Sequence, residues 1–304
     1  MPEFIDDAII LRCHRFSESS LVATACTSEH GRVDFLSKGC LREKSPLFGH
    51  VDHYQLVSLH ILERQNSGLD LLLGAQHIDD FSGLRFFPPA FAAAGFLADL
   101  VLATNCPGDP QANLFQELAL SLRLLAETGE AASVARLAPP SGLDRAERTI
   151  LADRILRAGL LRILAVLGWA LELERCLGCG EPPASHGNAL SSRHGGILCP
   201  ACRARPENRV GTGIWPIGGE SLSALQAAVK GADYDENRLP FRERGDLRRL
   251  LVDYSQYMVE KNLVSAGPLL QMFPETFSER PVARQAYATP GVEDKNNTGG
   301  TEID

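Results

Sequence analysis

The sequence predicts an α+β protein of more than one domain, with an N-terminal β-barrel and a helical C-terminal domain that contains an inserted four-cysteine module. Three observations lead to this prediction. Short apolar or alternating runs fill residues 1–82, long Ala- and Leu-rich segments follow, and two CxxC pairs interrupt those segments. A chain of 304 residues with 44% hydrophobic residues is long enough for about two domains.

Residues 1–82 are predicted to form a five-stranded barrel. Apolar and polar residues alternate in short runs, and segments containing Ser, Glu, Gly, Pro or Asn separate these runs. The expected strands are residues 8–13, 20–27, 32–37, 53–62 and 69–78. Five antiparallel strands of this size favour an OB-fold, a barrel class that binds nucleic acid, and an SH3-like barrel fits the pattern almost as well.

Residues 83–270 are predicted to form a helical domain. After Pro88 and Pro89, apolar residues recur at intervals of three and four with charged residues between them, which is the period of packed helices. The expected helices are residues 90–104, 111–128, 143–169, 220–230 and 246–263. Residues 271–304 are polar and poor in large apolar side chains, so we expect a disordered tail.

Four cysteines form two CxxC pairs between the helices, within residues 176–202. Nineteen residues separate the pairs, which is the spacing of a zinc ribbon. Each pair lets two sulfurs converge on one ion, and a glycine such as Gly180 permits the turn that this requires. Four thiolates leave no open coordination position, so the predicted Zn²⁺ is structural, with the ligands Cys176, Cys179, Cys199 and Cys202.

Two alternatives to this metal site stay open. The pairs can be unrelated buried or redox-active thiols, and His186 or His194 can replace one cysteine as a ligand. The other four cysteines occur singly in apolar or glycine-flanked segments, where a cysteine ordinarily behaves as a small buried hydrophobic residue. We assign no chemistry to them.

The charge and the missing motifs restrict the function. The net charge of −8 argues mildly against a nucleic-acid partner, but the sequence LSKGCLREKS gathers Lys38, Arg42 and Lys44 around a glycine and predicts a basic loop. The phosphate-loop, zinc-deaminase, GxSxG and HExxH motifs are missing, so we expect a protein that is not an enzyme. No apolar run suits a membrane span or a signal peptide, which predicts a cytoplasmic location.

At three places the sequence resembles the RecO family of bacterial DNA repair proteins, the recombination mediators. The first is IILRCHRFSESSLVATACTSEHGRVDFLSKGCLREKS, in which an acidic and serine-containing turn, a GR turn and a KG loop follow one another. The other two are LGWALELERCLGCG and GGILCPACR. The zinc module alone is less distinctive, but the order of the three places is specific, and the resemblance spans residues 4–264.

The resemblance implies an N-terminal OB-fold, a helical C-terminal domain and an inserted zinc module. It also implies a non-catalytic protein that binds single- and double-stranded DNA, anneals complementary strands and, with its partner RecR, helps load RecA onto DNA covered by single-strand-binding protein. Such a protein works in the cytoplasm, at the nucleoid. The family's basic positions that this sequence matches, and for which we expect DNA contact, are Arg15, Arg32, Lys38, Arg42 and Lys44.

Other side chains can add to such an interface. A barrel can place aromatic rings under bases, and Phe16, Phe35 and Tyr54 are available, although residues of this kind more often lie in a core. A second basic group, before and within the last long expected helix, is a candidate secondary patch: Arg242, Arg244, Arg248 and Arg249. It can extend the DNA path, capture the acidic tail of single-strand-binding protein, or form a salt-bridged helix face.

A rival function from another class fits the same composition. A zinc-ribbon protein-interaction scaffold without a direct nucleic-acid role agrees with the acidic net charge. Charge reversal in the basic loop separates the two functions, because a scaffold keeps its partners when the loop loses its cations and a DNA-binding mediator loses strand annealing.

Overall fold

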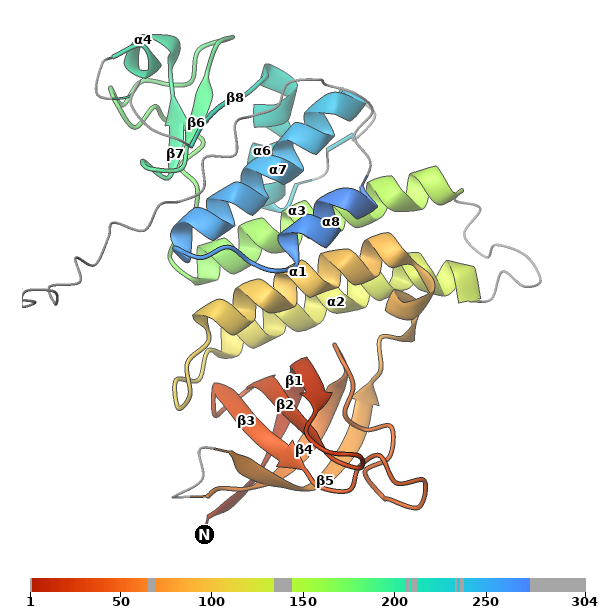
Figure 1. Cartoon of the computed structure of the whole chain (residues 1–304). Coiled ribbons are helices and arrows are strands. Elements are labelled where there is room, and N and C mark those ends of the chain that lie inside the picture. Colours follow the sequence, from red (N-terminus) through yellow and green to blue (C-terminus); the bar gives the residue numbers. More distant parts are fainter. Residues whose placement is uncertain are drawn as a thin grey trace, which may run out of the picture.

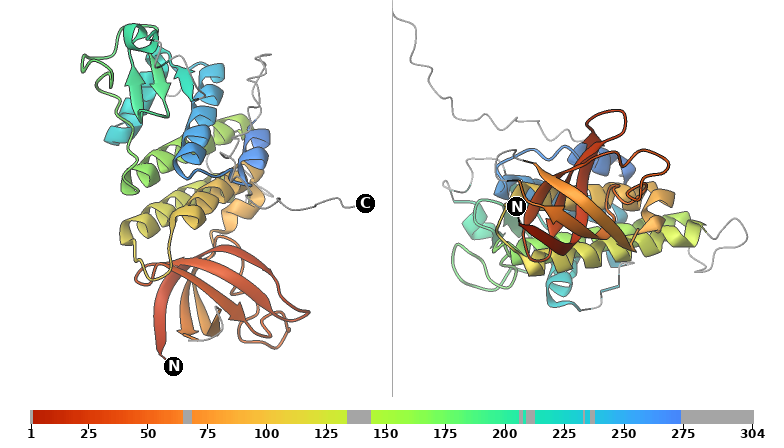
Figure 2. Two further views of the ribbon diagram at one scale, coloured as in Figure 1. Left: turned by 60° about the vertical axis from the view of Figure 1, so that its left-hand side comes forward. Right: turned by 90° about the horizontal axis from the view of Figure 1, so that it is seen from below.

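The computed structural model describes residues 2–64, 69–133, 144–205, 208, 213–232, 234, 235 and 238–273. Within these residues the chain forms a β-barrel, a group of packed helices and a small three-stranded module. Figure 1 shows the barrel and the small module at opposite ends of the molecule with the helices between them, and the left view of Figure 2 agrees.

The N-terminal sheet closes into the expected five-stranded barrel, with the strand order β1-β2-β3-β5-β4. Strands β3 and β5 pair in parallel, and the other neighbouring strands pair antiparallel. The strands are β1 (Glu3–Arg15), β2 (Leu21–Thr27), β3 (Arg32–Ser37), β4 (Leu56–Leu62) and β5 (Asp70–Asp79). Four of them begin and end within about three residues of the predicted runs, whereas β1 is longer at both ends because it pairs with both β2 and β4.

Strand β1 is buried on both faces, which explains its continuous apolar run. Ala8 and Ile10 point into the barrel and belong to its interior core. Ile9 and Leu11 point the other way and join the core of the helices. Because alternate residues of one strand serve two cores, the barrel and the helices are packed as one body rather than tethered by a linker.

The helical part contains the five long helices that the sequence predicts, and they build one continuous core. It also contains a 3₁₀ helix η1 and a short helix α8 that the sequence did not predict. The elements are η1 (Ser82–Phe86), α1 (Pro88–Thr104), α2 (Ala112–Ser133), α3 (Arg145–Val166), α6 (Gly219–Lys230), α7 (Phe241–Met258) and α8 (Ala266–Met272).

Helix α3 occupies the centre of this domain. Its N-terminus is closed by a capping box, in which Asp144 accepts from the Glu147 N–H and the Glu147 carboxylate accepts from the Asp144 N–H. Leu156, Leu160 and Ile163 are buried along it. Helices α1, α2, α6 and α7 all contact α3, so its position fixes the domain.

The small module is a three-stranded sheet with the order β7-β6-β8 and one helical turn. Its strands have three residues each, too short for an alternating pattern to be visible in the sequence. They are β6 (Ala189–Ser191), β7 (Gly196–Leu198) and β8 (Ile214–Pro216), and the helical turn is α4 (Pro200–Arg203).

The expected domain limits at residues 82 and 270 remain predictions, although two structural facts bear on them. Helix η1 begins at Ser82, directly after the barrel. The first three residues of the expected tail are part of α8 and its C-terminal cap, and Phe273 is buried. Residues 274–304, the rest of that tail, lie outside the described residues. Among the described helices, none combines the length and the apolarity that a membrane span needs.

Candidate nucleic-acid interface and metal centre

The connection between β3 and β4, residues 38–55, carries three of the predicted DNA contacts. Buried Cys40, Leu47 and Val51 anchor it to the core inside the barrel. Between these anchors the backbone makes successive tight turns, in which Ser45 N–H donates to Arg42 O at 2.9 Å and Phe48 N–H donates to Ser45 O at 3.1 Å. The turns leave the polar side chains outside, so Lys38, Arg42 and Lys44 are exposed.

The strand register brings Arg15 to the same end of the barrel. Arg15 is opposite Leu21, and Leu21 is opposite Ser37, the residue before Lys38. Two further hydrogen bonds join the β1–β2 turn to the loop: Leu41 N–H donates to Ser19 O at 3.0 Å and Gly39 N–H donates to Ser20 Oγ at 3.1 Å. Within the described part of the chain none of the four exposed cations makes an ion pair. We call Arg15, Lys38, Arg42 and Lys44 the loop cations.

Two exposed aromatic rings accompany the loop cations. Phe16 is 63% exposed directly after Arg15, and Phe48 is 54% exposed in the connection. A surface hollow of about 440 Å³ is lined by Arg15, Leu41 and Phe48 among others. Phe48 was not among the aromatic residues predicted for this surface. Its place between Pro46 and Gly49, in a turn-rich segment beside basic residues, is the signal that could have identified it.

The other two aromatic candidates do not belong to this surface. Phe35 is buried in the interior core of the barrel. Tyr54 is half-buried and its ring packs edge-on against Phe91 of α1, with the ring centroids 5.2 Å apart. Neither ring is placed to stack on a base at the loop cations.

The structure separates Arg32 from the loop cations. Arg32 begins β3 and Lys38 follows its end, so the two Cα atoms are about 20 Å apart along the strand. The Arg32 N–H donates to Cys106 O at 3.1 Å, and its Nε lies 3.3 Å from Asp34 Oδ2. The preceding Gly31 has φ of +72°, and a Cβ there would lie 2.6 Å from two carbonyl oxygens of the α1–α2 connection. The GR turn therefore docks the barrel on the helices.

Arg248 of the candidate secondary patch is not on the surface. It is 4% exposed, and its Nη1 lies 2.6 Å from Asp153 Oδ1. Its Nη2 donates to Phe273 O at 3.0 Å. Asp153 also accepts from Arg157 Nε at 3.0 Å, so α7, α3 and the end of α8 meet at a buried charge cluster. The prediction that Arg248 belongs to a surface patch was wrong, because its position on α7 directs the side chain into the domain core.

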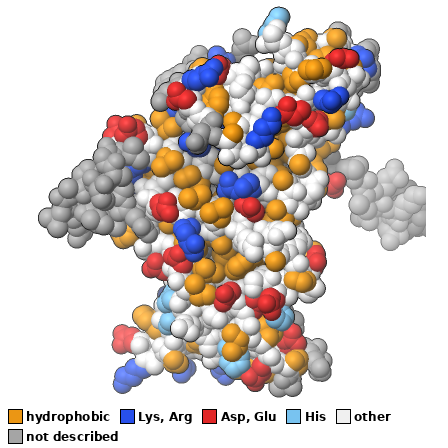
Figure 3. All heavy atoms as spheres, turned by 180° about the vertical axis from the view of Figure 1, so that it is seen from behind, with side chains coloured by type: hydrophobic (Ala, Val, Ile, Leu, Met, Phe, Trp, Pro, Cys, Tyr) orange, Lys and Arg blue, Asp and Glu red, His pale blue; other side chains and the backbone are white. Residues whose placement is uncertain are grey.

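The other three arginines of the candidate secondary patch differ in exposure. Arg242 is exposed, whereas Arg244 and Arg249 are half-buried. Arg244 Nε donates to Leu239 O at 3.1 Å, which closes the start of α7. On the face of the molecule shown in Figure 3, acidic and basic side chains are interspersed, and no wide field of one sign covers that face.

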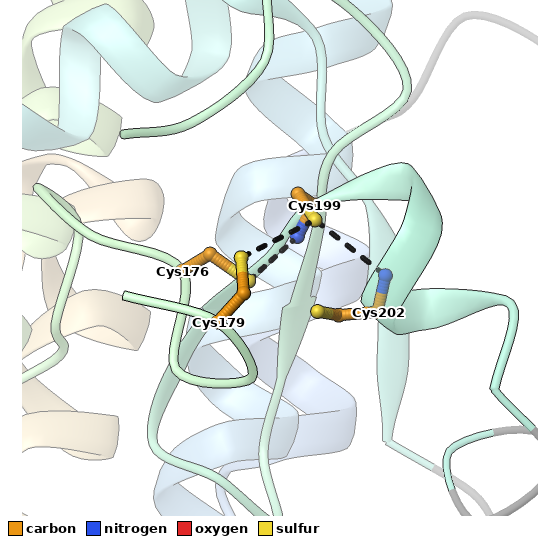
Figure 4. Close-up of side chains that lie close together, drawn as sticks. All are labelled: Cys176, Cys179, Cys199 and Cys202. Carbon is orange, nitrogen blue, oxygen red and sulfur yellow. Dashed lines mark hydrogen bonds between the residues drawn. The ribbon is translucent and has the colours of Figure 1, made fainter. Parts of the chain in front are cut away.

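The four cysteines of the two CxxC pairs converge in the small module, as Figure 4 shows. Their sulfurs all lie within 4.8 Å of one another, and the Sγ atoms of Cys179 and Cys199 are 3.9 Å apart. A tetrahedral zinc ion with sulfurs at about 2.3 Å requires sulfur–sulfur separations of about 3.8 Å. All eight cysteines are free of disulfide bonds.

Backbone geometry prepares this cluster for an ion. Gly180, in the left-handed region at φ +77°, completes a tight turn in which its N–H donates to Cys176 O at 2.7 Å. Cys199 caps the helical turn α4, and its sulfur accepts from the Cys202 N–H at 3.5 Å. His186 and His194 bond to neighbouring serines, and neither belongs to the four-residue cluster found among the described residues.

The pKa values of thiols in the four-cysteine cluster favour the binding of a cation. Burial alone would raise the pKa of Cys176, but N–H groups of Cys199, Gly178 and Cys179 point at its sulfur and lower the pKa to about 6. Burial, and then the neighbouring thiols, raise the pKa of Cys202 to about 12. Four thiolates this close repel one another, so the cluster can ionise fully only around a positive ion.

Comparison with known proteins completes this description. The fold and the two sites define a class of protein with an N-terminal barrel, a helical body and a four-cysteine module. Residues 1–81 match the family model described as recombination protein O N terminal, and residues 143–266 match recombination protein O C terminal. Together these matches cover most of the chain, which belongs to the RecO family.

Curated relatives agree over two thirds or more of this chain. The DNA repair protein RecO of Pelotomaculum thermopropionicum is 28% identical over 282 residues, which are 92% of this chain and 96% of that protein. The DNA repair protein RecO of Bifidobacterium adolescentis is 25% identical over 272 residues, 87% of this chain and 98% of that protein. That of Cutibacterium acnes is 27% identical over 208 residues, 67% of this chain and 75% of that protein. All three names describe repair proteins, and none indicates a catalytic activity.

Proposed function

We propose that this chain is a non-catalytic recombination mediator that binds and anneals single-stranded DNA and, with RecR, assists RecA loading onto DNA covered by single-strand-binding protein. It also binds double-stranded DNA and acts in the cytoplasm at the nucleoid. Membership of a DNA repair family supports the general role. The observation that carries the molecular proposal is the group of four unpaired loop cations beside two exposed aromatic rings.

The barrel supplies the DNA-binding surface in this proposal, and we assign it to the OB class. Five strands in the closed order β1-β2-β3-β5-β4 support that assignment. The loop cations follow the phosphate backbone, and Phe16 and Phe48 stack on bases, which is how such barrels hold single strands without sequence preference. Because the loop cations are few and the net charge of the protein is −8, we expect weak binding at physiological salt, strengthened by RecR.

The four-cysteine cluster holds a structural Zn²⁺ in this proposal. The ligands would be Cys176, Cys179, Cys199 and Cys202, and the ion would supply no chemistry beyond cross-linking the two turns. Outside Cys176, Leu198 and Cys202 the module has little core of its own, so the ion would carry most of its folding energy. The module shapes a surface for protein partners at the end of the molecule away from the barrel.

An annealing assay tests this function. Complementary strands covered with single-strand-binding protein are mixed with the full chain or with a Lys38→Glu, Arg42→Glu variant, and duplex formation is followed in time. Annealing by the wild type and its loss in the variant support a mediator. A control is Arg238→Glu, a charge reversal at an exposed residue of the helical part, whose Nη2 pairs with Glu220 Oε1 at 3.0 Å.

The rival function makes a different prediction in the same experiment. The net charge of −8 favours a protein-interaction scaffold that meets no DNA. A scaffold would show no annealing even as wild type, while pull-down of its protein partners would be equal for both chains. Equal annealing by the wild type and the Lys38, Arg42 variant would remove the loop cations from the proposal.

A further inference from the structure

Three side chains with metal-binding atoms meet at the rim of the barrel, and two of them, Cys13 and Asp52, also line the hollow beside the loop cations. Cys13 lies near the end of β1, and Asp52 and His53 lie at the end of the 38–55 connection. Cys13 Sγ is 3.3 Å from His53 Nδ1, and His53 Nδ1 is 3.4 Å from Asp52 Oδ1. One ligand atom from each residue lies within 4.8 Å of the other two.

An irregularity in β1 turns Cys13 toward this point. Ala8 and Ile10 face the barrel interior, so strict alternation would point Arg12 inward and Cys13 outward. The register between β1 and β2 shifts by one residue between Ile10 and Arg12, which makes Leu11 a β-bulge. After the bulge Arg12 is exposed and Cys13 packs on the interior side. Bulges that redirect a side chain in this way are typical of functional positions.

The second segment is clamped against the same strand. Tyr54 N–H donates to Ile10 O at 2.8 Å, and Ile10 N–H donates to Gln55 O at 3.0 Å, directly beside the bulge. Tyr54 has φ of +64°, an uncommon conformation for a bulky residue. The clamp and this turn place His53 beside Cys13, although the two residues are 40 positions apart in the sequence.

We propose that Cys13, His53 and Asp52 bind a divalent ion of the zinc class and form a second metal site, separate from the four-cysteine cluster. Zinc accepts sulfur at about 2.3 Å and nitrogen or oxygen at about 2.0 to 2.1 Å, so a tetrahedral site needs ligand separations of about 3.6 Å for S–N and about 3.3 Å for N–O. The observed separations of 3.3 Å for Sγ–Nδ1 and 3.4 Å for Nδ1–Oδ1 lie within about 0.3 Å of these values, and Cys13 Sγ lies within 4.8 Å of a carboxylate oxygen of Asp52.

The surroundings favour an ion at this point. Arg85 Nη2 donates to Asp52 Oδ2 at 3.1 Å, which orients the carboxylate and leaves its Oδ1 toward His53. Partners of this kind around metal ligands fix their orientation. The side chains of His53 and Asp52 are 37% and 52% exposed, so an ion can enter from solvent. Three protein ligands leave a fourth position for water.

The site would add a metal cross-link between two segments that already meet through backbone hydrogen bonds and through the interior core of the barrel. It ties β1 to the connection that carries Lys38, Arg42 and Lys44, and an ion there would restrict the movement of that connection. This consequence concerns the proposed DNA contacts, but the metal site itself does not depend on them.

Cobalt binding by the full chain tests the site. The chain is loaded with Co²⁺, the bound metal is counted, and the thiolate-to-cobalt absorption is recorded for the wild type, Cys13→Ser and His53→Gln. We expect two ions per wild-type chain and one in each variant. In Cys13→Ser the thiolate absorption should fall by about one fifth, because four of five metal-bound sulfurs remain.

Cys106→Ser is the matched control, since Cys106 is exposed and, among the residues that the structure describes, its Sγ belongs to no cluster of metal-binding side chains. It should keep two ions. Absorption from the four-cysteine cluster reports that each variant is folded. A single ion in the wild type, or two ions in both Cys13→Ser and His53→Gln, overturns the proposal and leaves a Cys13–His53 hydrogen bond as the whole role of the pair.

Discussion

Two basic regions of this molecule, the loop cations of the barrel and the arginines of α7, have different surroundings in the structure. Arg42 lies on a tight turn, exposed and without an ion pair in the described part of the chain. Arg248 is almost fully buried against Asp153 and the Phe273 carbonyl. One guanidinium is available to a ligand, and the other holds three helices together.

The two regions differ because one is a turn-rich loop and the other is a helix. A turn-rich loop anchored by a few apolar residues leaves its long polar side chains in solvent. A helix presents one face to the core, and Arg248 falls on that face with Leu247, Leu251 and Val252. A buried guanidinium requires a carboxylate and further acceptors, and the α3 and α8 segments supply them.

The largest expected effect is on stability, from Arg248→Ala. The change leaves the Asp153 carboxylate in the core with one partner fewer and the Phe273 carbonyl without its donor. We expect the free energy of unfolding in urea to fall by about 3 to 5 kcal/mol. The matched control, Arg42→Ala, should change it by less than about 0.5 kcal/mol. If Arg248→Ala keeps wild-type stability and binds DNA more weakly, Arg248 contacts DNA instead of stabilising the core.

The second expected effect is on the salt dependence of DNA binding. Four phosphate contacts give a log–log slope of about −3, so wild-type affinity for single strands should fall about 50-fold between 50 and 200 mM salt. With all four loop cations changed to Gln, binding should be weak and almost independent of salt, as a fluorescence titration would show. Arg32→Gln should leave the slope unchanged, because Arg32 lies at the other end of β3. An equal slope in the four-Gln variant contradicts the proposed interface.

Much of this architecture could be predicted from the sequence, because local patterns carry it. Alternation and turn residues located all five barrel strands, the helical period located the five long helices, and CxxC spacing located the cysteine cluster. The burial of individual cations could not be predicted, since Arg248 is buried by contacts with Asp153 and Phe273, which are distant from it in the sequence. The Leu11 bulge and the meeting of Cys13 with His53 depend on strand pairing, which leaves no signal within one segment.

The third effect separates stacking from charge at the proposed interface. Phe48→Ala removes an exposed ring beside the loop cations, and base stacking contributes about 1 to 3 kcal/mol per base. Affinity for single strands should therefore fall roughly 10-fold while the salt slope stays as in the wild type. Phe48→Tyr keeps the ring and should keep the affinity. A changed slope in Phe48→Ala would mean that the ring only positions the loop.

The smallest effect concerns a carboxylate on the same helix as Arg248. Burial raises the pKa of Asp253 to about 6, although Arg249 opposes the rise. The folded state then holds the Asp253 proton to a higher pH than the unfolded state, whose pKa is about 3.9, so folding stability falls as pH rises from about 4 to 6.

Asp253→Asn removes that penalty and should raise the free energy of unfolding by about 1 kcal/mol at pH 7.5 and by almost nothing at pH 4. Asp246→Asn, exposed on the same helix, is the control and should change stability by less than about 0.5 kcal/mol at either pH. Equal effects of Asp253→Asn at both pH values would mean that the carboxylate is solvated. More of the α7 surface would then be open to solvent than the burial of Arg248 indicates. The surroundings of α7 would differ less from those of the loop cations.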